Sequence, residues 1–161
     1  MSYEKAGYPV KDIANWFIRR NKIEEEDNGS ERITLLKLLK LLYYAEGCSL
    51  ALNNRSLFND EIRAWEHGPV VPNVYYAYNS DSYNLPVDET TDFYSLFKKE
   101  DLDCLEKVFQ VFGAYNAWAL RDKTHKEKPW LEATFNGQKL NGIISRDTMK
   151  DYFEKNYIRE D

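Results

Sequence analysis

With 161 residues, a hydrophobic fraction of 43% and a net charge of −5, the chain suits one globular domain that buries roughly two-thirds of its unfolded surface. Basic residues are interspersed with acids and form no stripe, so we expect no direct binding to nucleic acid. We expect no membrane span, because the most apolar stretch, residues 33–52, contains three charged residues. The N-terminus lacks an apolar leader, which favours a cytoplasmic protein.

Two helices are predicted in the first third of the chain. Apolar residues at helical spacing predict a helix from Val10 that ends near Arg20, where two cations suit the negative end of the helix dipole. The acidic segment 22–30, which contains Asn-Gly, is expected to be a solvated, mobile loop. Thr34 is expected to cap a central helix that runs to about Leu52 and is covered on most sides.

The middle of the chain is predicted to contain both β-strands and a helix. A break at 53–55 precedes the segment 57–65, whose alternating residues could form one short β-hairpin. Pro69 and Pro72 bracket the start of another helix, since proline is tolerated in a first turn. The polar segment 79–92 is expected to be a loop.

The last third is predicted to be helical. Apolar residues repeat every three or four positions over 102–112, and Gly113 follows where a left-handed C-cap is expected. Asn116 and Ser145 are expected to be N-caps, and Pro129 fits the first turn of a short helix.

These elements predict a mainly α fold, a compact single-domain bundle over residues 1–161. It should have about six to eight helices and at most one small β-hairpin. Cys48 and Cys104 lie on apolar helical faces, so we expect reduced, buried thiols and no disulfide framework.

Catalytic chemistry finds little support. The order His125-Lys126-Glu127 is similar to half of a zinc deaminase signature, but the paired-cysteine half is absent. No glycine-rich phosphate loop occurs, and a nucleophilic thiol would need a histidine in a partly exposed, electropositive pocket. We therefore expect no catalytic residue, no metal and no cofactor. A small metal-dependent or thiol hydrolase is the alternative class.

Two short stretches hold both histidines, three of the five prolines and two of the four tryptophans. We name residues 63–72 the first motif loop and residues 124–130 the second motif loop. Their rigid residues could simply turn the chain and fill the core, or they could form a recognition surface together with nearby tyrosines. The candidate motif or partner-binding residues are Trp65, His67, Gly68, Pro69, Tyr75, Tyr76, Thr124, His125, Lys126, Pro129 and Trp130.

The ordered combination of Lys37–Gly47, Leu57-Phe58, 64–75 and the second motif loop closely resembles the Panacea domain family, which comprises SocA-like antitoxins and phage-associated, GepA-like proteins. The resemblance extends from about Val10 to about Phe153 and implies a mainly helical antitoxin. Such a protein neutralises a toxin protein, typically encoded by the adjacent gene, by direct contact.

One branch of this family acts instead as a proteolytic adaptor that delivers its toxin to a AAA+ protease, and this is the alternative mechanism. The expected partner is therefore a cognate toxin, with a AAA+ protease as a second partner under the alternative. The chain departs from the shortest form of the family pattern in the acidic insert Glu24–Asp27 and in the Tyr-rich, polar segment 75–92.

Overall fold

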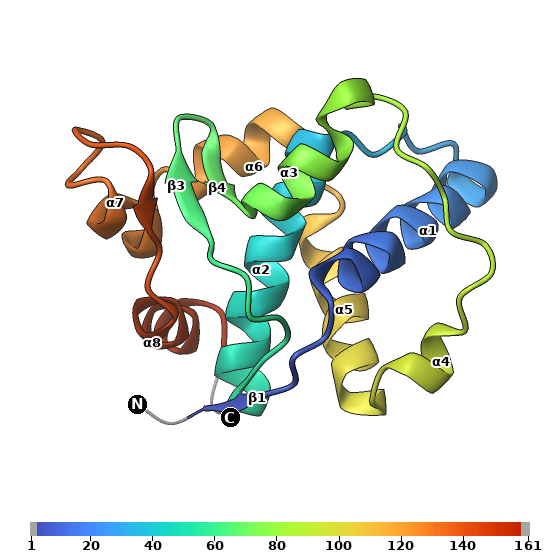
Figure 1. The fold of residues 1–161 in the computed structure, drawn as a ribbon, viewed down its shortest axis with the longest axis horizontal. Helices are drawn as coiled ribbons and strands as arrows, with labels where there is room; N and C mark the ends of the chain where they lie inside the picture. The colour runs from blue at the N-terminus through green and yellow to red at the C-terminus, as the bar shows by residue number, and fades with distance from the viewer. Residues whose placement is uncertain (1–2, 159–161) are drawn as a thin grey trace.

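The computed structural model describes residues 3–158 and has one helix, α2 (Leu35–Asn53), at its centre (Figure 1). Every residue from Leu38 to Leu50 is buried, which confirms the prediction of a helix covered on most sides. The Thr34 hydroxyl accepts a hydrogen bond from the backbone N–H of Lys37 at 3.2 Å, so the predicted N-cap is also confirmed.

The described residues contain seven further α-helices around α2, and the mainly α fold predicted from the sequence is confirmed. These helices are α1 (Val10–Asn28), α3 (Pro72–Tyr78), α4 (Phe93–Leu96), α5 (Lys99–Phe112), α6 (Ala117–Thr124), α7 (Lys128–Ala133) and α8 (Arg146–Asn156). A 3₁₀ turn, η1 (Asn79–Asp81), follows α3. No helix within residues 3–158 is both long enough and apolar enough to cross a membrane.

Helix α2 packs against α1 and α5 on one side and against α6 and α8 on the other (Figure 1). The approach of α8 depends on Gly47, because a Cβ atom added there would lie 2.4 Å from the ring of Phe153. The apolar side chains of these helices join one hydrophobic cluster. Burial of this cluster supplies the main driving force for folding.

The strands are more extensive than one hairpin. Strand β1 (Glu4–Lys5) pairs in parallel with β2 (Arg55–Ser56), and β3 (Arg63–Trp65) lies between two antiparallel neighbours, β4 (Gly68–Val70) and β5 (Gly142–Ile143). The predicted hairpin over 57–65 is therefore wrong, because only residues 63–65 of that segment form a strand, and the turn to its partner lies at 66–67. Of the two prolines predicted to bracket a helix start, Pro69 belongs to β4 and Pro72 begins α3.

Helix α1 is longer than predicted. It continues to Asn28, so most of the segment expected to be a loop forms its last turns. The Arg20 guanidinium lies 2.7 Å from the Glu24 carboxylate, one turn further on, and offsets part of the repulsion among the acids. Gly29, with φ 69°, ends the helix in the left-handed conformation.

The remaining helix signals are mostly confirmed. Asn116 and Ser145 each accept a hydrogen bond from the backbone N–H three residues further along, and Pro129 lies in the first turn of α7. Helix α5 covers the predicted apolar repeat. The predicted left-handed C-cap at Gly113 is wrong, because φ there is −64° and the backbone stays right-handed into the next turn.

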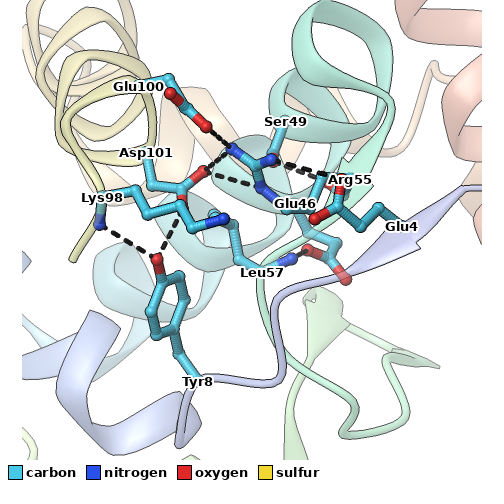
Figure 2. A network of polar contacts seen from close by, with 9 residues as sticks. All are labelled: Glu4, Tyr8, Glu46, Ser49, Arg55, Leu57, Lys98, Glu100 and Asp101. Carbon is cyan, nitrogen blue, oxygen red and sulfur yellow. Dashed lines mark hydrogen bonds and ion pairs between the residues drawn. The ribbon is translucent and has the colours of Figure 1, made fainter. Parts of the chain in front are cut away.

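A buried charge network ties the N-terminal segment to the start of α5 (Figure 2). Arg55 lies 2.8 Å from both Glu100 and the fully buried Asp101, and 3.6 Å from Glu4. The hydroxyl of Tyr8 donates to Asp101 at 2.6 Å. Because the buried charges are paired and hydrogen-bonded to one another, this network holds β1 and β2 against α5 and has a structural role.

Candidate functional site: the two motif loops

The structure joins the two motif loops into one unit, although they are far apart in sequence. The first forms the β3–β4 hairpin and enters α3, and the second leads from the end of α6 into α7. The indole N–H of Trp130 donates to the backbone carbonyl of Trp65 at 3.0 Å. His125 Nε2 lies 2.6 Å from the carbonyl oxygen of Glu66, and its ring packs on that of Trp130 with centroids 4.1 Å apart.

Both loops close over Lys40 of α2. Gly68 has φ +108°, and a Cβ atom added there would lie 2.6 Å from Lys40 Cε and 2.8 Å from the Thr124 hydroxyl. Glycine is therefore needed both for the backbone conformation and for this close approach. The Lys40 ammonium donates to the carbonyl of Pro69 at 3.0 Å. Burial, and secondarily the charge of Arg121, lowers the pKa of Lys40 to about 7.

The buried side chain of Glu127 anchors the second motif loop to the core. Its carboxylate is 2% exposed and accepts hydrogen bonds from three tyrosine hydroxyls, those of Tyr43 at 3.0 Å, Tyr44 at 3.3 Å and Tyr157. Burial raises the pKa of Glu127, while these hydrogen bonds act in the opposite direction. The loop is thereby fixed to α2 and to the end of α8.

The eleven candidate residues divide by exposure. Gly68, Pro69, Thr124, Pro129 and Trp130 are buried, Trp65, Tyr75 and His125 are half-buried, and His67, Tyr76 and Lys126 are exposed. The half-buried Trp65 ring packs edge-on against Tyr75, with centroids 5.1 Å apart. The buried residues thus have the core-filling role that the sequence left open, and the exposed ones remain able to touch a partner.

Sequence reasoning missed four residues of this site: Lys40, Trp118, Arg121 and Glu127. Arg121 Nε donates to His67 Nδ1 at 3.0 Å, and its guanidinium lies 5.1 Å from the centre of the Trp118 ring. The spacing of Trp118 and Arg121, three residues apart in a predicted helix, was the available signal. The sequence did not indicate the burial of Glu127, because a glutamate between two lysines is typical of an exposed segment.

Two sources of catalytic chemistry were considered from the sequence, a metal ion and a nucleophilic thiol. Within residues 3–158, no three His, Cys, Asp or Glu side chains are placed to hold a metal ion. Cys48 and Cys104 are buried free thiols, as predicted. Burial raises the pKa of Cys104 to about 12 and also raises that of Cys48, whereas a nucleophilic cysteine needs a lowered pKa.

Because Trp130 joins the two motif loops, we expect a large loss of stability when its indole is removed. Trp130→Ala is expected to lower the free energy of unfolding by about 3–5 kcal/mol, because it empties a core site and removes the hydrogen bond to Trp65. Trp118→Ala is the matched control, since this indole is 58% exposed and should cost less than about 1 kcal/mol. Urea denaturation measures both, and equal costs would contradict the coupling of the loops.

The sequence of this part of the chain matches a known protein family. The family described as antitoxin SocA-like, Panacea domain, matches residues 38–131, which is more than half of the chain. Comparison with curated proteins and with solved structures gave no match. The matched residues run from the buried part of α2 to α7 and include both motif loops that close over it. By this match, and by the resemblance of its motifs, the chain belongs to the family of SocA-like antitoxins with a Panacea domain.

Proposed function

We propose that this protein is an antitoxin that neutralises a cognate toxin protein, the product of the adjacent gene, by direct binding in the cytoplasm. The observation that carries the proposal is the family match over residues 38–131. The arrangement of the motif loops supports it, because His67, Tyr76 and Lys126 are exposed on a rigid, buried frame. A rigid frame lowers the conformational entropy lost on binding and so favours a tight complex.

The energetic requirement is a complex that persists at cellular concentrations. This corresponds to a dissociation constant that is roughly nanomolar, or about −12 kcal/mol. A few exposed aromatic and long side chains at the centre of an interface commonly supply most of such an energy. Tyr76, which is 67% exposed, is the aromatic residue among the candidates with the greatest access to a partner.

Growth rescue tests this proposal. Co-expression with the adjacent gene should rescue growth in cells with and without their AAA+ proteases, because inhibition by contact needs no degradation. Tyr76→Ala and Lys126→Ala should weaken rescue without lowering stability, since both side chains are exposed. Tyr94→Ala on α4, at a side chain 88% exposed, is the control and should rescue fully.

Two results would replace the proposal. Rescue that disappears without a AAA+ protease, while the toxin still co-purifies, assigns the adaptor mechanism. If the adjacent gene product neither binds nor is neutralised, the antitoxin function itself is wrong.

A further inference from the structure

Three side chains contact one another where the first motif loop meets α6: His67 of the loop, and Trp118 and Arg121 of the helix. Arg121 Nε donates to His67 Nδ1 at 3.0 Å, and the guanidinium carbon lies 5.1 Å from the centre of the Trp118 ring. The rings of His67 and Trp118 pack edge-on, with centroids 5.7 Å apart. His67 and Trp118 are exposed and Arg121 is half-buried, so a partner can reach these three residues, which we name the Arg121 cluster.

The hydrogen bond from Arg121 fixes the position of the proton on the His67 ring. An arginine Nε–H can only donate, so His67 Nδ1 is the acceptor and the ring proton lies on Nε2. Nε2 of His67, the indole N–H of Trp118 and Nη2 of Arg121 have no hydrogen-bond partner among residues 3–158. All three groups are donors, so the cluster offers a partner only donors.

Basic residues outnumber acids around the cluster. Residues 117–130 include four basic and two acidic residues, although the whole chain has a net charge of −5. Of the two acids, Glu127 is buried beneath tyrosine hydroxyls, and Asp122 contacts only Nη1 of Arg121, at 3.1 Å. The one other acid of the two motif loops is Glu66. Lys40, fully buried beneath the loops, has a single hydrogen bond, to a backbone carbonyl, and no carboxylate partner within residues 3–158.

A carboxylate suits this cluster because it is negatively charged and has only acceptors. Its hydrogen bonds to a guanidinium are among the strong ones in proteins. Contact with the Trp118 ring and with His67 also holds the guanidinium in place, so less side-chain entropy is lost on binding. We propose that the Arg121 cluster binds an aspartate or glutamate side chain of the toxin, with Arg121 as the principal contact.

This inference rests on the proposed function and names the chemistry of its partner. A phosphate of a nucleic acid would offer similar acceptors, but the net charge of −5 opposes the approach of a polyanion. A folded toxin with a single acidic side chain at this place meets only the local excess of basic residues. The occupant is therefore a protein carboxylate.

Matched variants test the cluster with the purified product of the adjacent gene. Arg121→Gln should weaken its binding about tenfold or more, because the change removes a charged donor to the carboxylate. Lys99→Gln, which removes one positive charge at an exposed site on α5, is the control and should change affinity by less than about twofold. His67→Phe keeps a ring beside Trp118 and removes the Nε2 donor, so it should weaken binding as well.

Carbodiimide cross-linking identifies the group that is bound. The reagent joins an amine to a carboxylate in contact with it, forming an amide with loss of water. In the complex of Arg121→Lys with the toxin, the amine at position 121 should be linked to an aspartate or glutamate of the toxin. Lys99, in the same sample, should have no link to the toxin. Mass spectrometry of the digested complex reads both results.

The outcomes separate this inference from the antitoxin function. Normal binding by Arg121→Gln, or a complex in which position 121 has no link to a toxin carboxylate, overturns the inference and leaves the antitoxin function intact. A complex that forms only when nucleic acid is present assigns a phosphate as the bound anion and also overturns it. Failure of the natural protein to bind the adjacent gene product overturns both.

Discussion

Replacing Lys40 with methionine is expected to remove a contribution to the free energy of unfolding that rises by about 3 kcal/mol between pH 7 and pH 9.5 in the natural protein. Burial lowers the pKa of Lys40 to about 7, and its ammonium has one hydrogen bond, to Pro69. The cost of burying this charge is therefore present at neutral pH and disappears when the amine loses its proton.

The sign follows from the protons bound by each state. Between pH 7 and the ordinary lysine pKa of 10.5, the unfolded chain keeps the proton on Lys40 and the folded chain has released it. Because the unfolded state binds more protons, stability rises with pH. The buried thiols Cys48 and Cys104 act in the opposite direction above about pH 9, since burial raises their pKa values, but Lys40→Met retains both.

Urea denaturation of both proteins across this pH range measures the difference. Lys139→Met, at an exposed lysine, is the matched control and should keep the pH dependence of the natural protein. A parallel pH dependence in the natural protein and in Lys40→Met would show that Lys40 does not titrate beneath the motif loops.

Removing Arg146 is expected to lower the free energy of unfolding by about 3–5 kcal/mol, because it leaves a buried carboxylate without its counter-ion. Arg146 Nε lies 2.6 Å from Oε2 of Glu46, which is fully buried. The other carboxylate oxygen accepts the backbone N–H of Leu57 at 2.6 Å. Burial raises the pKa of Glu46 and Arg146 acts against that rise, so the penalty in Arg146→Met should shrink as the pH falls.

A double-mutant cycle separates this pair from its surroundings. Glu46→Gln combined with Arg146→Met should cost clearly less than the sum of the two single changes. Glu154→Gln, in an exposed ion pair on the same helix, should cost less than about 0.5 kcal/mol. Additive costs would mean that Glu46 and Arg146 do not depend on each other.

The fold was predictable where the signal is local. Thr34, Asn116 and Ser145 cap helices through their own side chains, so each start is encoded within four residues. Strand pairing is not local, since β3 contacts β5 through residues near 64 and 142. The end of α1 predicted from the apolar periodicity was also too early, because a polar contact between Arg20 and Glu24 supports the helix beyond that point.

The two motif loops of the candidate site were predictable from the sequence, but their contacts with each other and the burial of their neighbours were not. Rare, rigid residues identified both motif loops, but a sequence pattern does not reveal that Trp130 bonds to a backbone carbonyl in the other loop. Lys40 and Glu46 interrupt the apolar pattern of α2 and would be expected at a surface, although both are fully buried. For this reason, changes at buried motif residues report stability, and only exposed ones such as Tyr76 report binding.

Inhibition by contact requires that the two purified proteins bind each other, and calorimetric titration measures this binding. The protein is added to the adjacent gene product in a calorimeter, in buffer without nucleotide or protease. We expect a complex with a roughly nanomolar dissociation constant. Absence of binding, or a dissociation constant weaker than about 1 μM, would contradict it.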